Sequence, residues 1–159
     1  MKVFLLVLLS LTMAWAWPDH NEHHHHHHDH GAAYVVKTHD DLIRFRNVCT
    51  ERVHADEEDI AKYKKWDFPD NEKTRCYIRC VFEHFGFFDE VTGFDVHKVH
   101  EQLAGTKGEQ VDHTDDTHQK IANCADSNEQ KSDACTWAYR GAMCFMGANL
   151  QLVQHSVKV

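Results

Sequence analysis

The sequence predicts an all-α fold, a compact bundle of about six helices held together by three disulfides. Apolar residues recur at spacings of three and four, which is the periodicity of amphipathic helices. The chain has only two prolines, and its glycines lie mainly at the ends of the expected helices. Six cysteines, an even number, follow an N-terminal secretory signal. In a small secreted protein such a count indicates disulfides.

The N-terminus has the pattern of a signal peptide over residues 1–16. Lys2 precedes an apolar run, and small residues end the run at Ala14-Trp15-Ala16, which predicts cleavage before Trp17. The run is too short to span a bilayer, and no later segment is apolar enough to cross one. We therefore expect a secreted, extracellular protein with no membrane insertion.

The chain is acidic, with a formal net charge of −8 that becomes one unit more negative when Lys2 leaves with the signal peptide. An acidic protein is a poor partner for nucleic acid and for anionic lipid. We therefore expect no nucleic-acid partner.

The first expected helix begins at Thr38, where Asp41 three residues later forms a pair like a capping box. Its apolar face carries Leu42, Phe45, Cys49 and Val53. A short second helix begins after Asp56 and runs to about Trp66. It ends before Pro69, because the residue that precedes a proline is pushed out of helical geometry.

The third expected helix runs from about Asp70 to Phe85, and Gly86 is a natural end because glycine tolerates positive φ. The fourth runs from about Asp95 to Ala104 and ends at Gly105. Its apolar stripe, at spacings i, i+3, i+4 and i+7, carries Val96, Val99, His100 and Leu103.

The fifth expected helix, about Thr114 to Asp126, repeats this pattern, and the sixth runs from Ser132 to about Met146. No segment shows a clear alternation with a period of two. Residues 147–159 are partly apolar, and their pattern does not decide between helix, strand and irregular tail.

The cysteine spacing limits the possible disulfides. Three residues separate Cys76 from Cys80, so on a helix both sulfurs lie on one face a turn apart and do not bond to each other in regular geometry. Eight residues separate Cys135 from Cys144, a rise of about 13 Å, so these two also need other partners. Of the 15 pairings that six cysteines allow, spacing removes some and selects none.

The intervals between successive cysteines are 26, 3, 43, 10 and 8 residues. This pattern resembles the six-cysteine signature of the insect odorant-binding proteins, the pheromone-binding and general odorant-binding family. The resemblance covers roughly Thr38 to Met146. Four short motifs are similar to a fly branch of that family: Lys64-Lys65-Trp66, Cys76-Tyr77-Ile78-Arg79-Cys80, Gly93-Phe94-Asp95 and Ala142-Met143-Cys144-Phe145.

The resemblance implies a secreted carrier that binds a small hydrophobic ligand, such as an odorant, a pheromone or a lipid-like molecule, in an internal apolar cavity. It also implies three interlocked disulfides, Cys49–Cys80, Cys76–Cys135 and Cys124–Cys144. No cofactor is implied, and an odorant receptor is a possible partner. Some members of the family place a hydroxyl where Phe87 stands, so a phenyl ring there favours a purely apolar ligand.

Aromatic residues crowd the stretch between the third and fourth expected helices: Phe82, Phe85, Phe87, Phe88 and Phe94. By resemblance this region walls the cavity, and the matching wall positions are Phe82, Phe87, Phe94 and Phe145. Phe88 from the same cluster and four residues of the fourth and sixth helices complete the candidate wall: Val96, Val99, Leu103 and Met143. The alternative for any one of these residues is a place in an ordinary packed core.

A tract of six consecutive histidines follows the expected cleavage site. It consists of His23, His24, His25, His26, His27 and His28. Neutral imidazoles bind Zn, Cu and Ni, so weak metal capture is expected of the arm alone. The tract has the form of an expression tag or of a natural low-complexity arm, and we expect residues 17–37 to be disordered. The remainder divides into a helical domain, residues 38–146, and a C-terminal tail, residues 147–159, that could act as a lid.

Other histidines, His97, His100, His113 and His118, have spacings that permit a metal, but we expect them on solvated helix faces. No H-E-x-x-H, G-x-S-x-G or phosphate-binding glycine motif occurs, so we expect no enzyme. Two alternatives remain open: a haemolymph or reproductive-fluid lipid carrier on the same fold, and a metal-buffering protein that works through its histidine arm. Ligand affinity is expected to fall on acidification, through His84, His100, His118 or His155.

Overall fold

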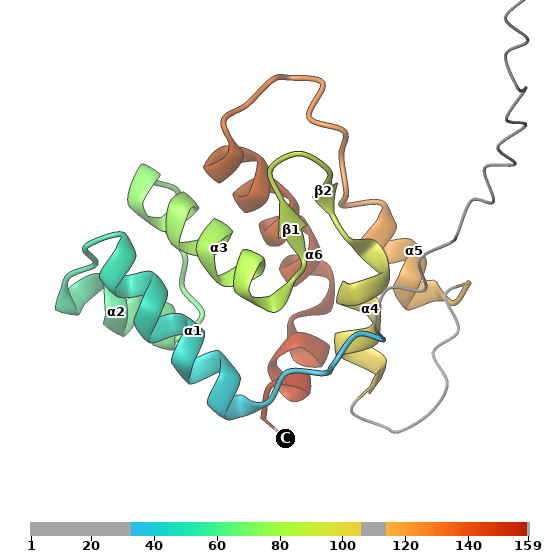
Figure 1. The fold of residues 1–159 in the computed structure, drawn as a ribbon, viewed down its shortest axis with the longest axis horizontal. Helices are drawn as coiled ribbons and strands as arrows, with labels where there is room; N and C mark the ends of the chain where they lie inside the picture. Colours follow the sequence, from blue (N-terminus) through green and yellow to red (C-terminus); the bar gives the residue numbers. More distant parts are fainter. Residues whose placement is uncertain (1–32, 106–113, 159) are drawn as a thin grey trace, which may run out of the picture. The chain divides into compact units, whose positions relative to one another are not determined.

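The computed structural model describes residues 33–105 and 114–158. Within them the fold consists of six helices and a two-stranded hairpin (Figure 1). The first three helices are α1 (His39–Arg52), α2 (Glu57–Lys64) and α3 (Glu72–Phe85). The hairpin β1 (Phe88–Asp89) and β2 (Gly93–Phe94) follows, and then α4 (Val96–Gly105), α5 (Asp116–Ala122) and α6 (Ala134–Ser156). None of the helices in these two ranges is both long and apolar enough to span a membrane.

Several expectations for the N-terminal part of the chain lie outside the described residues, as does His113. They are the signal peptide, its cleavage site and the weak metal site of the arm. The histidines of that arm site, all outside the described ranges, are His23, His24, His25, His26, His27 and His28. Metal capture by these six residues therefore stays a prediction.

The helix ends follow local chemistry that the sequence already shows. Thr38 and Asp41 form the capping box that was predicted, in which each side chain accepts a hydrogen bond from the other residue's backbone N–H. Asp56 and Asp59 do the same at the start of α2. Gly86 ends α3 in the left-handed region, with φ of +79°, which glycine adopts without steric cost. The all-α class and these boundaries are therefore confirmed.

The bounds of α5 and the end of α6, predicted at about Met146, differ from the prediction. α5 begins one residue after Asp115, which caps it, and ends at Ala122 instead of Asp126. The chain leaves the helix there because Cys124 is bonded to α6, and because Asp126 accepts hydrogen bonds from Trp137 and Arg140 of α6. The undecided C-terminal segment is helical as far as Ser156.

α6 breaks its regular geometry at Asn149, where φ is −137°. The Asn149 side-chain amide donates to the carbonyl oxygen of Phe145 at 3.1 Å, which is the acceptor that the Asn149 backbone N–H would use in a regular helix. The break divides α6 into a first part that packs on α3 and a shorter second part. In Figure 1 the end of that second part lies beside the segment that leads into α1, and His39 Nδ1 is 3.0 Å from the carbonyl oxygen of Val157.

The hydrophobic core is built around α3 and α6, which pack against each other more extensively than any other pair of elements. α3 is buried along most of its length because apolar residues occupy more than one face. Small residues on α6 allow a close approach: Ala138 and Ala142 are completely buried, and the ring of Phe94 lies directly over Gly141. The hairpin thus closes over α6 through an aromatic ring.

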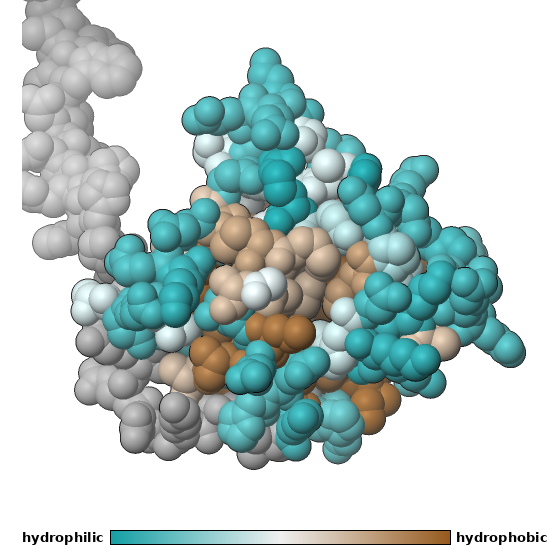
Figure 2. Space-filling model, turned by 180° about the vertical axis from the view of Figure 1, so that it is seen from behind, coloured by the Kyte–Doolittle hydropathy of each residue, from teal (hydrophilic) through white to brown (hydrophobic). Residues whose placement is uncertain are grey.

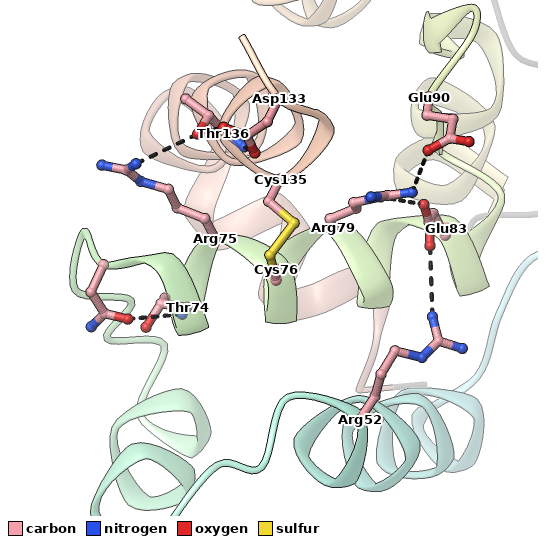
Figure 3. Close-up of a disulfide and its surroundings, with 11 residues drawn as sticks. Arg52, Thr74, Arg75, Cys76, Arg79, Glu83, Glu90, Asp133, Cys135 and Thr136 are labelled. Atoms are coloured by element: carbon pink, nitrogen blue, oxygen red, sulfur yellow. Dashed lines mark hydrogen bonds and ion pairs between the residues drawn. A yellow bond between two sulfur atoms is a disulfide. The ribbon is translucent and has the colours of Figure 1, made fainter.

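The three disulfides cross-link the bundle through α3 and α6. They join Cys49 to Cys80, Cys76 to Cys135 and Cys124 to Cys144, the three pairs that the family resemblance implies. Figure 3 shows the Cys76–Cys135 bridge between α3 and the start of α6, with the ion pairs of Arg79 beside it. The bridges close loops of 31, 59 and 20 residues. In the chain-entropy model each contributes about 3 to 4 kcal/mol.

Two glycines of α6 give a matched test of this packing. Gly141→Ala is expected to lower the free energy of unfolding by about 1 to 3 kcal/mol, because the new methyl group overlaps the Phe94 ring. In Gly147→Ala no atom lies within 4 Å of the new methyl group. This substitution should leave the free energy of unfolding unchanged or raise it by up to about 1 kcal/mol through helix propensity. Urea unfolding of the oxidised proteins measures both. Equal stabilities would contradict the packing described for Phe94.

Candidate ligand-binding site

A narrow cavity of about 50 Å³ lies in the interior between α1, α3, α4 and α6. Its walls are almost entirely apolar. The lining consists of Leu42, Arg46, Trp66, Phe68, Tyr77, Ile78, Val81, Phe82, Phe85, Phe87, Gln102, Leu103, Phe145, Met146, Val153, Ser156 and Val157. The space is smaller than the roughly 300 to 1,000 Å³ of typical ligand pockets. A ligand larger than a few water molecules therefore needs wall side chains to move.

Four of the nine predicted wall residues line this cavity: Phe82, Phe87, Leu103 and Phe145. The three aromatic rings among them form one cluster, because the Phe82 ring centre lies 5.7 Å from that of Phe87 and 6.1 Å from that of Phe145. The four residues come from α3, from the segment after Gly86, from α4 and from α6. The apolar periodicity of α3, α4 and α6 brings the three helical residues, Phe82, Leu103 and Phe145, to one place.

The other five predicted wall residues lie outside the cavity lining: Phe88, Phe94, Val96, Val99 and Met143. Phe88 packs edge-on against Trp137 at 5.3 Å, and Phe94 stands behind Phe82 at 5.8 Å. The hairpin, whose strands have two residues each, turns both rings toward α6 instead of toward the cavity. These aromatic rings therefore support the wall from outside.

Much of the lining comes from segments that the sequence did not point to. Leu42 and Arg46 come from α1, Trp66 and Phe68 from the segment between α2 and α3, and Val153 from the end of α6. The apolar face of α1 was predicted, but its role as a wall depends on how α1 crosses α3. The contribution of Val153 depends on the helical conformation of the C-terminal segment.

Gln102 is the polar centre of one end of the cavity and is 2% exposed. Its Oε1 accepts from the Tyr34 hydroxyl at 2.9 Å and from the Lys37 backbone N–H at 2.7 Å. Its Nε2 donates to the carbonyl oxygens of Lys37 and Ser156 at 3.0 and 3.3 Å. All four hydrogen-bonding positions of the amide are used, so Gln102 ties the N-terminal segment, α4 and the end of α6 together.

The N-terminal segment thus packs behind this wall, although none of its residues lines the cavity. Residues 33–37, which the sequence assigns to the arm, have no regular secondary structure. Tyr34 packs against Phe87 with ring centres 6.1 Å apart. Burial raises the pKa of the Tyr34 hydroxyl well above its ordinary value, so the hydroxyl remains a donor to Gln102 at every physiological pH.

The histidines that were expected on solvated faces lie in different surroundings. His97 is exposed, but His100 is completely buried, which corrects that expectation. The helical periodicity of α4 turns His100 inward together with Val99 and Leu103. The Nε2 atom of His100 lies 3.2 Å from Asp115 Oδ1. None of His84, His100 and His118 lines the cavity. The expected loss of affinity in acid stays a prediction.

One group of described residues has donor atoms close enough to suggest a metal site: Cys49, Cys80 and His84. Both sulfurs are joined in a disulfide, and a disulfide offers no thiolate to a metal. The His84 ring stacks on Phe45 at 5.2 Å. This group is therefore a packing contact beside the Cys49–Cys80 bridge.

The fold and the cavity define a small helical protein, cross-linked by disulfides, with an enclosed apolar interior. The chain belongs to the PBP/GOBP family, whose model matches residues 31–148. General odorant-binding protein 99b of Drosophila melanogaster is 57% identical over 126 residues, which cover 79% of this chain and 84% of that protein. Odorant-binding protein 22 of Aedes aegypti is 37% identical over 80% of this chain and 88% of that protein.

Solved structures support the same fold. The Anopheles gambiae odorant-binding protein 22a superposes with a TM-score of 0.54, at 23% identity, over 65% of this chain and 94% of that chain. A D7 protein from Phlebotomus duboscqi gives a TM-score of 0.57 at 17% identity, over 76% of this chain and 48% of that chain. Both likenesses concern the fold alone.

Gln102→Leu tests the tie that Gln102 makes. The substitution keeps much of the side-chain volume but leaves the buried partner groups of Gln102 without hydrogen bonds, so we expect a loss of at least about 2 kcal/mol. Gln119→Leu on the exposed face of α5 should stay within about 0.5 kcal/mol. Hydrogen exchange should also accelerate at the Lys37 amide. Unchanged protection at Lys37 would show that the segment is held by other contacts.

Proposed function

We propose that the protein is a secreted carrier that binds one small hydrophobic ligand reversibly inside the cavity. Membership of the family of odorant-binding proteins supports a carrier of small hydrophobic ligands. The observation that carries the proposal to this site is the composition of the lining, where aromatic and aliphatic side chains from α1, α3, α4 and α6 converge on one enclosed space.

The binding is non-covalent in this proposal. All six cysteines are in disulfides, so none of them is available as a nucleophile. Burial of apolar surface contributes about 25 cal/mol per Å². After the cost of immobilising the ligand, this term supports affinities on the order of micromolar. Such an affinity suits uptake at one place and release at another.

The second part of α6 is the wall best placed to open. It belongs to residues 147–159, for which the sequence suggested the role of a lid. Val153, Ser156 and Val157 close one side of the cavity, and the break at Asn149 separates them from the part of α6 that packs on α3. Displacement of these residues would widen the cavity without disturbing a disulfide. The lid role rests on this arrangement.

Paired valine substitutions test the location of the binding site. Val81→Phe places a larger side chain in the cavity and should weaken binding of a neutral apolar fluorescent probe, such as N-phenylnaphthylamine, by at least about tenfold. Val48→Phe, the same change on the exposed face of α1, should leave the affinity unchanged. Probe titration with thermal unfolding as a folding control gives both results. Equal affinities in the two variants would place the site elsewhere.

A further inference from the structure

Arg46 on α1 borders two spaces at once. It lines the interior cavity, and it also lines a surface groove of about 290 Å³ between α1 and α2. Tyr77 of α3 is the other residue that borders both. These two side chains therefore lie between the apolar interior and a groove that opens to solvent between α1 and α2. Figure 1 shows these two helices at one end of the bundle.

The charge of this boundary is opposite to that of the whole chain. The protein has 25 acidic and 17 basic residues, yet the charged residues that line the groove are Arg46 and Lys64, and no described carboxylate belongs to its lining. Among the described residues that line the interior cavity, Arg46 alone is charged. This boundary is therefore a favourable place for an anionic group.

Arg46 differs from the other arginines of α1 in its partners. Arg44 pairs with Asp41, and Arg52 lies 3.8 Å from Glu83. In the part of the chain that the structure describes, no carboxylate lies within 4 Å of the Arg46 guanidinium. A half-buried guanidinium beside an apolar cavity, without a counter-ion from the protein, is an incomplete ion pair.

The surroundings of Arg46 hold the guanidinium and keep its donors usable. Its carbon Cζ lies 5.1 Å from the centre of the Trp66 ring, and stacking on a ring face leaves the N–H groups in the guanidinium plane available to an anion. Burial raises the pKa of Tyr77 to about 12, and the nearby positive charge of Arg46 acts against that rise. The Tyr77 hydroxyl stays protonated and is a second donor at the same place.

We infer that the ligand is an amphipathic anion, a long-chain carboxylate whose head group pairs with Arg46 while its hydrocarbon chain occupies the apolar cavity. A single guanidinium matches the two oxygens of one carboxylate. This inference rests on the proposed carrier function and replaces the expectation of a purely apolar ligand. The chain would provide most of the affinity by burial, and Arg46 would fix which end of the ligand lies beside the groove.

Two ligands of equal chain length test the inference: dodecanoate and dodecanol, near neutral pH, by displacement of the neutral probe. Wild-type protein should prefer dodecanoate by about tenfold, because a hydrogen bond to a charged group is stronger than one to a neutral group. Arg46→Met should remove that preference by weakening dodecanoate alone. Arg44→Met removes one positive charge from the same helix outside both spaces and should keep the preference.

The outcomes separate the two proposals. Equal affinity of the wild-type protein for the acid and the alcohol would overturn the head-group inference and leave the carrier function intact. A wild-type protein that binds neither ligand nor the neutral probe would overturn the carrier function itself. If Arg46→Met lost affinity for dodecanol as strongly as for dodecanoate, Arg46 would be a packing residue, and the inference would again be wrong. Arg46→Lys, which keeps the charge without the two-pronged geometry, should retain part of the preference.

Discussion

The position of α3 is the constraint on which the other parts of the structure depend. Two cysteines one turn apart, Cys76 and Cys80, tie this helix to the start of α6 and to α1. Both partners are thereby fixed along one helix in register, with ion pairs of Arg79 on the exposed side of the junction (Figure 3). A bundle fixed in this way does not need complete packing at its centre. The apolar residues of α3 can therefore form a cavity wall.

The surface of the bundle repeats the contrast between apolar and charged groups at a larger scale. Seen from behind, an apolar area is bordered by hydrophilic residues (Figure 2). The exposed large apolar side chains of the described residues include Leu150 and Leu152 of α6. The cavity differs from this surface because its lining contains one charged side chain, the cationic Arg46. Burial is non-directional, whereas a guanidinium orients its partner, so Arg46 supplies the direction that the apolar walls cannot.

The sequence predicted the elements better than the site. Thr38, Asp41 and Gly86 marked helix ends correctly because capping is local chemistry. The end of α5 was misplaced because the Cys124–Cys144 bridge and the Trp137 hydrogen bond act across the fold. Phe82 and Leu103 were placed on the wall by apolar periodicity and family resemblance. Arg46 could not be found in this way, because a charged residue one turn after Leu42 resembles any solvated flank of an amphipathic helix.

The central claim is that the ligand occupies the interior between α1, α3, α4 and α6. Intermolecular nuclear Overhauser effects between isotope-labelled protein and unlabelled dodecanoate test it most directly. The account predicts contacts from the ligand methylene protons to the ring protons of Phe82, Phe87 and Phe145. It also predicts contacts from the protons on the carbon next to the carboxylate to the side-chain protons of Arg46. Contacts confined to exposed side chains such as Val48 and Leu150 would contradict it.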